Sequence, residues 1–195
     1  YYFDAAAVPY TIASMESLHK AQFGRNGYVQ NLAEIKKLIG FSTLGMNHKI
    51  EAAAEDYSID SALAQRLFFV NDALQQASSG LSKTKDETGF YYDYIYLPAL
   101  IYHQLLEFEN TLLDAAHYKL DYRDKENKKV ELGKINQLIT VATAQLKEIY
   151  KTCMEGDKNK KWATWYDPAK RRPNNGFPTL DMIESINKSL NDLEN

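Results

Sequence analysis

Cysteine is almost absent from this 195-residue chain. Cys153 is the one cysteine, so no intrachain disulfide can form and a disulfide scaffold is excluded. The compartment stays open, because many exported domains also lack disulfides. No apolar run approaches the ~20 residues that a membrane-spanning helix needs, and no basic-then-apolar signal sequence stands at the start. The first residue is Tyr1 rather than Met, which indicates a mature product or a fragment of a longer protein.

The motifs of familiar catalytic machinery are missing as well. The sequence has no Gly-rich phosphate loop, no serine nucleophile elbow, no paired CxxC and no HExxH. The net charge is only -3, from 23 basic and 26 acidic residues, so no overall charge attracts the chain to nucleic acid or to an anionic membrane. We expect no cofactor and no nucleic-acid partner. A non-catalytic role is favoured for the chain in isolation, and the question of an enzyme stays open.

Periodic apolar residues indicate about seven helices in one soluble domain that spans residues 1–195. Hydrophobic residues make up 45% of the chain and charged residues 25%, as is usual for a globular protein. The predicted helices cover 11–23, 28–39, 42–56, 58–79, a stretch ending near 120, 129–154 and a last stretch from 179. Because the connections are mostly short, we expect an all-α, multi-helix bundle of the up-and-down type. One long tryptophan-containing loop, at 155–178, interrupts it. On the first helix, Ile12, Met15 and Leu18 form the apolar face.

The aromatic run of residues 90–97 has the composition of a strand, but no strand partner is visible. A helix is therefore favoured, with Pro98 at a first turn or at a kink in a longer helix. The tyrosines of the run either pack in the bundle with their hydroxyls at its rim or form a stacking platform. They are Tyr91, Tyr92, Tyr94 and Tyr96.

Four other single residues have ordinary interpretations. Arg66, Asn71 and Asp72 are interpreted as residues on the solvated face of the helix that begins at residue 58. Cys153 lies near a helix C-terminus, whereas a thiolate is favoured at the opposite end of a helix. It is therefore a poor candidate for a nucleophile.

Residues 157–178, called the tryptophan segment below, hold both tryptophans of the chain. The segment carries six basic residues against two acidic ones, so the rest of the chain is more acidic than the whole. Aromatic faces beside cations can stack on sugars and pair with anions. The alternative is that the tryptophans anchor an irregular segment to the bundle while the lysines stay in solvent. The candidate ligand-binding residues are Trp162, Trp165, Tyr166, Lys170, Arg171 and Arg172; a site for anionic polymers would also use Lys158, Lys160 and Lys161 in the basic stretch 158–172.

All four histidines lie at helical spacing from a carboxylate. Ferritin-like bundles hold two metal ions with Glu-x-x-His on two helices and a Glu from each of two others. The candidate metal ligands are Glu16, His19, Asp114 and His117; the pairs His48–Glu51 and His103–Glu107 have the wrong order or spacing. The alternative is that these are solvated pairs, or histidines that form hydrogen bonds inside the bundle.

One part of the sequence resembles a known class of proteins. From Lys160 the sequence reads Lys-Lys-Trp-Ala-Thr-Trp-Tyr and then Arg-Arg-Pro-Asn-Asn-Gly-Phe-Pro up to Pro178, before a short predicted helix. This segment resembles the helical C-terminal segments of large glycan-processing enzymes from Bacteroidetes-type bacteria. The resemblance implies an accessory helical domain in the periplasm or on the cell surface, beside a catalytic domain that these residues do not include. It supplies no catalytic residues.

Three functional hypotheses follow. The first is a non-catalytic helical accessory or interaction module, associated with glycan binding or processing, whose partner is another protein domain or a glycan. It predicts an apolar or aromatic patch on the surface. The second is a bundle-type metal-dependent enzyme, and the third is a binder of anionic polymers, whose affinity would fall with salt.

Overall fold

The computed structural model describes residues 4–23, 58–85, 88–121, 128–170 and 177–179, with the single positions 181, 184 and 188. Within them the chain is helical and has no strand, so the all-α prediction is confirmed. The α-helices are α1 (Val8–Phe23), α4 (Ser58–Leu81), α5 (Leu97–Asp121), α6 (Lys128–Gly156) and the short α7 (Ala163–Tyr166), and a π-helical turn η2 (Tyr92–Tyr96) directly precedes α5. The described part thus contains five α-helices rather than about seven. The helices predicted at 28–39 and 42–56, and most of the one from 179, lie outside the described residues.

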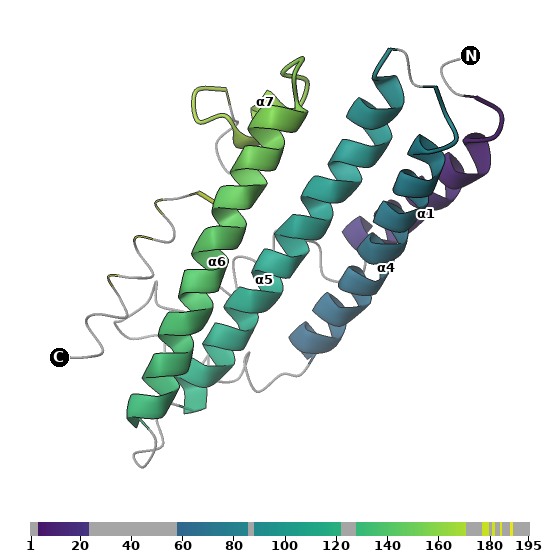
Figure 1. Ribbon diagram of the computed structural model, residues 1–195. Helices are drawn as coiled ribbons and strands as arrows, with labels where there is room; N and C mark the ends of the chain where they lie inside the picture. Colours follow the sequence, from purple (N-terminus) through teal and green to yellow (C-terminus); the bar gives the residue numbers. More distant parts are fainter. Residues whose placement is uncertain are drawn as a thin grey trace.

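The long helices pack in consecutive pairs. The main contacts are those of α1 with α4, α4 with α5, and α5 with α6. Figure 1 shows α4, α5 and α6 side by side, with α1 against α4 and α7 beside the C-terminal end of α6. No helix in the described part of the chain is long and apolar enough to cross a membrane.

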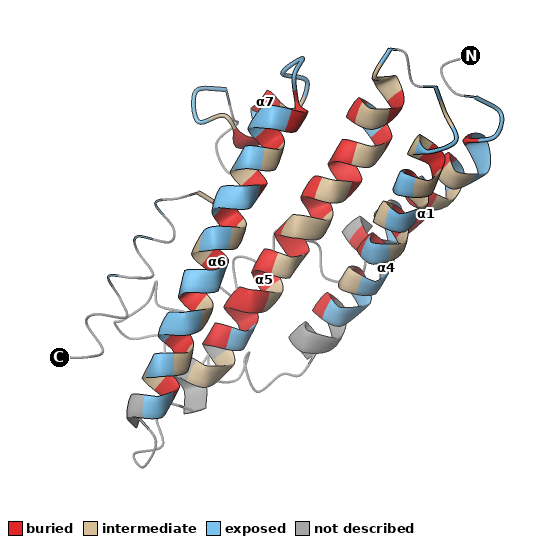
Figure 2. Ribbon diagram, in the orientation of Figure 1, coloured by how far each residue is buried: buried red, intermediate tan, exposed pale blue. Residues whose placement is uncertain are grey.

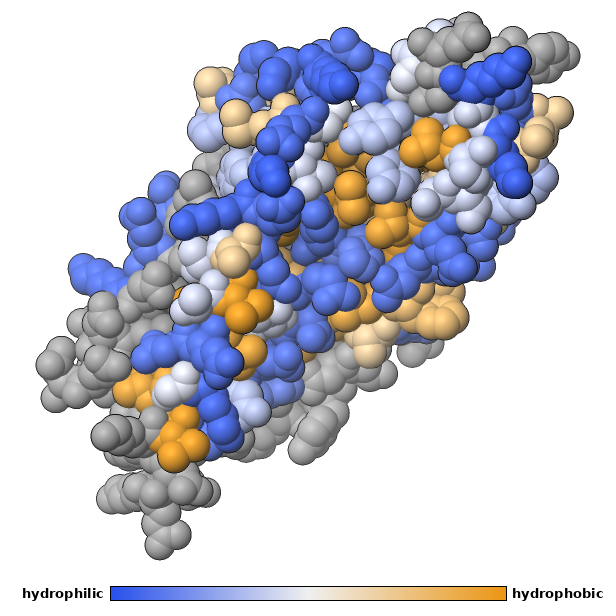
Figure 3. Space-filling view, in the orientation of Figure 1, coloured by the Kyte–Doolittle hydropathy of each residue, from blue (hydrophilic) through white to orange (hydrophobic). Residues whose placement is uncertain are grey.

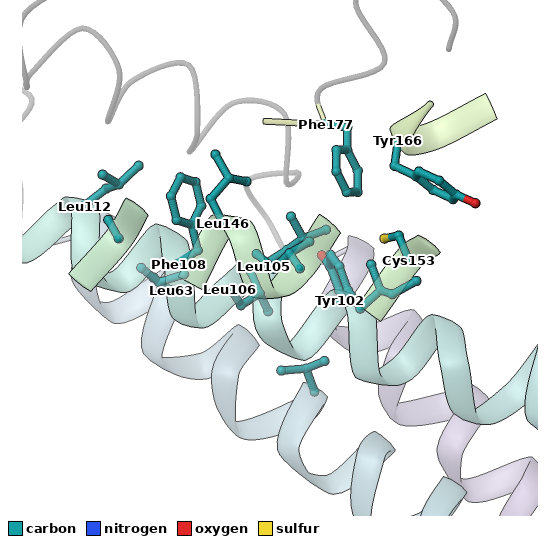
Figure 4. Close-up of a cluster of buried hydrophobic side chains, with 14 of the residues drawn as sticks. Leu63, Tyr102, Leu105, Leu106, Phe108, Leu112, Leu146, Cys153, Tyr166 and Phe177 are labelled. Atoms are coloured by element: carbon teal, nitrogen blue, oxygen red, sulfur yellow. The ribbon is translucent and has the colours of Figure 1, made fainter. Parts of the chain in front are cut away.

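Helix α5 forms the centre of the hydrophobic core. Most of its described turns bury two or more residues, whereas α6 buries one face and exposes the residues between (Figure 2). The main cluster combines side chains from all five described α-helices, and its large aliphatic and aromatic members come mostly from three of them, among them Leu63 on α4, Phe108 and Leu112 on α5, and Leu146 on α6. Figure 4 shows this cluster, with Cys153, Tyr166 and Phe177 gathered at one end. The end of α6 and the tryptophan segment therefore share the core of the long helices.

Helix α1 buries a face that the apolar pattern did not indicate. Ile12 and Met15 are 54% and 57% exposed, whereas Ser14 and Ser17 are buried against α4. The hydroxyl of Ser14 donates to the backbone oxygen of Ala73 at 2.8 Å, and that of Ser17 donates to the Asp72 carboxylate. Small side chains let two helix backbones approach closely, and these hydrogen bonds satisfy the hydroxyls that the approach buries. Of the apolar face predicted for the first helix, Ile12 and Met15 are thus exposed, whereas Leu18 is partly buried and packs against the main cluster.

Arg66 is not a surface residue, and its interpretation as one is wrong. It is 2% exposed, and its Nε donates to the backbone oxygen of Ala21 at 2.9 Å. A terminal nitrogen of the guanidinium donates to the hydroxyl of Tyr102, and another lies 4.0 Å from the carboxylate of Glu109, which is fully buried. A charged group is retained in a core only when such partners compensate its lost hydration. Asn71 and Asp72 were also predicted to lie on the solvated face of α4: Asn71 is exposed as predicted, and Asp72 is half-buried.

The tyrosine-rich run is helical, as predicted, but its turn is wider than that of an α-helix. The backbone N–H of Leu97 donates to Tyr92, five residues back, which closes the π-type turn of η2. Pro98, the next residue, has no N–H to continue this pattern. The Asp93 carbonyl is therefore left without a backbone donor from its own helix: Leu97 is already bonded to Tyr92, and Pro98 cannot donate.

Candidate functional site

A buried carboxylate shapes the first half of the tryptophan segment. Asp157 follows α6 directly and is 1% exposed. It accepts the backbone N–H groups of Lys161 and Trp162, both at 2.8 Å, and the hydroxyl of Tyr166 at 3.2 Å. One side chain thus fixes the turn after α6 and leads the chain into α7. Burial, and then the nearby Asp157 carboxylate, raises the pKa of Tyr166, so this hydroxyl stays protonated and continues to donate.

The end of α6 is placed closely against the beginning of α5. A Cβ built on Gly156 would lie 2.7 Å from the Cδ1 atom of Leu97, so no larger residue fits there without movement. This approach brings residues 157–162 over η2, more than 60 positions earlier in the sequence.

Asp93 on η2 receives the segment. Its carboxylate accepts Lys161 Nζ at 2.6 Å and Asn159 Nδ2 at 3.2 Å. Its backbone oxygen accepts the indole Nε1 of Trp162 at 2.8 Å. This is the carbonyl that the π-turn and Pro98 leave without a helical donor, so the indole replaces the missing backbone bond. The hydrogen bond to Asp93 is the main reason that the pKa of Lys161 is raised above its ordinary value, which keeps the lysine charged.

Four partly exposed rings lie in a row across this junction and are called the aromatic row below. Phe90 and Tyr94 have ring centroids 4.4 Å apart, Tyr94 and Trp162 are 5.9 Å apart in an edge-to-face contact, and Trp162 and Trp165 are 4.7 Å apart. Lys161 Nζ lies 4.4 Å from the centroid of the Tyr94 ring. Tyr94 is 41% exposed, and the two tryptophans are half-buried against the core. The row therefore joins anchoring contacts on its inner side to accessible ring surface on its outer side.

The charges of the segment are divided between inside and outside. The carboxylates of Asp93 and Asp157 are buried and bonded to the segment itself. Lys158, Lys160 and Lys170 are exposed and have no carboxylate partner within the described ranges. Asp167, the other acid of the segment, is half-buried and accepts the backbone N–H of Ala169 at 3.0 Å. The described surface of the segment thus carries aromatic rings and more exposed lysines than carboxylates.

Only two of the predicted ligand-binding residues lie in the aromatic row. Trp162 and Trp165 belong to the aromatic row, and Lys170 is exposed beyond α7. Tyr166 is buried with its hydroxyl on Asp157, so it holds the segment in place. Arg171 and Arg172 lie outside the described residues.

Sequence reasoning missed the two aspartates that organise the site. Neither Asp93 nor Asp157 stands in a recognisable motif, and each binds groups that are distant or outside any periodic pattern. Pro98 was the available signal, because a proline removes a backbone donor and frees a carbonyl one turn earlier. That signal does not say which side chain will fill the gap.

The proposed metal ligands are not brought together. Glu16 and His19 are on α1 and Asp114 and His117 are on α5, and both helices pack on α4. Glu16, His19 and Asp114 are exposed. Within the described parts of the chain, no three His, Cys, Asp or Glu side chains are placed to hold a metal ion. The His48–Glu51 pair lies outside those parts, and His103 lies 3.9 Å from Glu107 as an ordinary helical pair.

Cys153 lies on α6 inside the main cluster. Burial, and then the carboxylate of Asp157, raises the pKa of its thiol to about 12. A thiol that stays protonated in a closed site is a poor nucleophile, in agreement with its position near a helix C-terminus.

The described fold and site thus define an all-α protein with an anchored aromatic segment at one end. No family model, no curated protein and no solved structure matches this chain.

Proposed function

We propose that this chain is a non-catalytic helical accessory or interaction module whose aromatic row binds a glycan. The observation that carries the proposal is that hydrogen bonds hold the row in place while its rings stay partly exposed to solvent. Trp162 is held by its indole N–H on the Asp93 carbonyl, and Lys161 by the Asp93 carboxylate. Rings that are already ordered lose little conformational entropy when a ligand binds, so their stacking energy appears as affinity.

Sugar rings suit this surface chemically. Their C–H faces stack on aromatic rings, and their hydroxyls pair with nearby amides and ammonium groups. Trp165 and Tyr94 offer ring surface at the two ends of Trp162, and the exposed Lys158 and Lys160 supply polar groups on the turn before it. Tryptophan and tyrosine are favoured in contact surfaces because they combine large area with few rotatable bonds.

A second surface supports the role of an accessory module that packs on another domain. Val8, Ile12 and Met15 are spaced along one face of α1, and all three are at least 40% exposed. The face shown in Figure 3 is mostly hydrophilic, with separate apolar patches upon it. An apolar stripe on an outer helix is typical of a surface that another protein covers. The proposal therefore includes a protein partner. It also keeps two expectations from the sequence: an up-and-down bundle of about seven helices in the whole chain, and a place in the periplasm or on the cell surface.

The glycan proposal is tested by intrinsic fluorescence. Both tryptophans of the chain lie in the row, so their emission reports on this site alone. We expect a saturable shift of the emission with at least one member of a panel of neutral and acidic oligosaccharides. Trp165→Ala should abolish the shift, whereas Phe68→Ala, which removes an exposed ring on the outer face of α4, should leave it intact. Emission that no sugar changes would refute glycan binding at the row.

A further inference from the structure

We infer that the glycan bound at the aromatic row is acidic, with its carboxylate or sulfate groups held by Lys158, Lys160 and Lys170. This inference rests on the proposed function, because it assigns the class of ligand to the same site. It goes beyond that function in stating which charge the sugar carries and which side chains select it.

The first argument for an acidic ligand is the distribution of charge in the tryptophan segment. Lys161 is occupied by Asp93, at 2.6 Å, and serves the fold. The three other lysines of the described part of the segment are exposed and make no ion pair with a described carboxylate. Both nearby buried acids are engaged inward, so neither neutralises the outer surface. These three exposed lysines, called the cationic rim below, belong to the same segment as the two tryptophans. They are complementary to an anionic sugar and add to its binding, but not to that of a neutral sugar.

The second argument for an acidic ligand is the backbone conformation of Lys160. This residue has φ of 56°, in the left-handed region that favours glycine or asparagine. Its N–H donates to the backbone oxygen of Asp157 at 3.0 Å and closes the turn, a bond that either of those residues could also make. Its side chain is exposed and has no ion-pair partner among the described residues, so nothing in the described fold requires a lysine. A strained position occupied by the wrong residue for its conformation indicates a role for the side chain outside the fold.

The size and setting of the cationic rim favour a sugar over a long polyanion. The chain as a whole has a net charge of -3, and the segment contributes cations to that total, so the surface beyond the segment is acidic. An extended polyanion such as nucleic acid would cross this acidic surface, whereas an oligosaccharide with one or two anionic groups stays on the row. Lys158 and Lys160 precede Trp162 by four and two residues, in the turn that leads into the row, and Lys170 follows Trp165 by five residues.

The experiment compares trisaccharides in matched pairs, one neutral and one with uronate in the same linkage, by tryptophan fluorescence of the full chain. We expect the acidic member to bind at least fivefold more tightly at low salt, with the preference falling as NaCl rises from 20 to 300 mM. Lys160→Asn suits the left-handed turn and keeps the fold, and should reduce the preference by roughly two- to fivefold, the range of one exposed ion pair. The double variant Lys158→Gln/Lys160→Gln should reduce it further.

Two lysines of α6, Lys147 and Lys151, supply the matched control. Lys147→Gln/Lys151→Gln removes the same charge from an exposed helix face and should leave the preference unchanged. Equal binding of neutral and acidic members would overturn the inference and leave the proposed function standing. Binding of neither would overturn both. Competition by oligoglutamate of equal charge, as strong as that of the uronate, would show recognition of charge alone and would also overturn it.

Discussion

Among single residues, Trp162 makes one of the three contacts to Asp93 that link the two distant parts of the site. Its indole N–H takes the place of a backbone donor that η2 and Pro98 do not supply to the Asp93 carbonyl. We predict that Trp162→Phe, which keeps a ring but removes the donor, lowers the free energy of unfolding by about 1 kcal/mol or more. Urea denaturation followed by far-ultraviolet circular dichroism measures this change.

The same substitution in a Pro98→Ala background isolates the hydrogen bond. Alanine at this position restores an N–H, and either an α or a π register then gives the Asp93 carbonyl a donor from its own helix. We expect the penalty of Trp162→Phe to be about 1 kcal/mol smaller in that background. Equal penalties in the two backgrounds would mean that the indole does not replace a backbone bond.

A second prediction concerns the contribution of Arg66 to stability. Arg66→Met leaves the buried carboxylate of Glu109 without its guanidinium, and we expect a loss of roughly 3–5 kcal/mol of unfolding free energy. Replacement of both members, in Arg66→Met/Glu109→Leu, should cost less than the single change, because no buried charge then remains. Asn71→Ala on the same helix is the control and should stay within about 0.5 kcal/mol of the parent. An Arg66→Met protein as stable as the Asn71→Ala protein would contradict the buried position of the guanidinium.

The thiol of Cys153 gives a dependence of stability on pH. Burial raises its pKa to about 12 in the folded chain, whereas an unfolded chain releases the proton near pH 9. Below pH 9 both states hold the proton, so the thiol causes no pH dependence there. Above pH 9 the unfolded state loses its proton first, so the free energy of unfolding falls as the pH rises, by up to about 1.4 kcal/mol per pH unit.

This slope is checked by urea denaturation between pH 8 and 10.5 for the parent and for Cys153→Ala. Tyrosines with raised pKa values, such as Tyr102, contribute to both proteins, so the difference between the two slopes belongs to the thiol. We expect the variant to have the shallower slope. Parallel slopes would show that the thiol is not protected in the folded chain.

At the scale of elements, α1 shows how a helix can pack on its less apolar face. We predict that Ser14→Leu, although it makes the helix more hydrophobic, destabilises the protein by about 1–3 kcal/mol because the contact with α4 has no room for it. Ile12→Ser, which removes an exposed apolar side chain, should change stability by no more than about 0.5 kcal/mol. Thermal or urea denaturation of the two variants decides the matter. The reverse ranking would restore the face that periodicity predicted.

Periodicity predicted α4, α5 and α6 well because each buries large aliphatic residues at helical spacing, such as Leu63, Leu105 and Leu146. It identified the existence of α1 but only Leu18 of its buried face, since serine, threonine and alanine add little to an apolar pattern. The helical state of residues 90–97 was predictable from the lack of a strand partner, whereas the π-turn was not. That turn depends on a donor from Trp162, nearly 70 residues away, which no local pattern contains.

At the scale of the whole molecule, composition indicated the cationic tryptophan segment but not its position. Of the two alternatives left open for the tryptophans, the structure shows the anchoring contact, and stacking on a ligand stays a prediction. Trp162 anchors the segment through its indole N–H, and the same contact holds the neighbouring ring of Trp165 in the row. The site depends on Asp93 and Asp157, whose importance follows from the packing of α5 against α6 rather than from their sequence neighbours.

The most direct test of the proposed function is a ¹⁵N–¹H correlation spectrum of the labelled chain, read at the indole resonances. Only two indole signals exist, from Trp162 and Trp165, and both belong to the aromatic row. We predict that the Trp165 signal moves saturably as an acidic oligosaccharide is added, while the Trp162 signal keeps the shift of a hydrogen-bonded donor. Indole signals that stay fixed while resonances elsewhere move would place the binding surface away from the row and contradict the account.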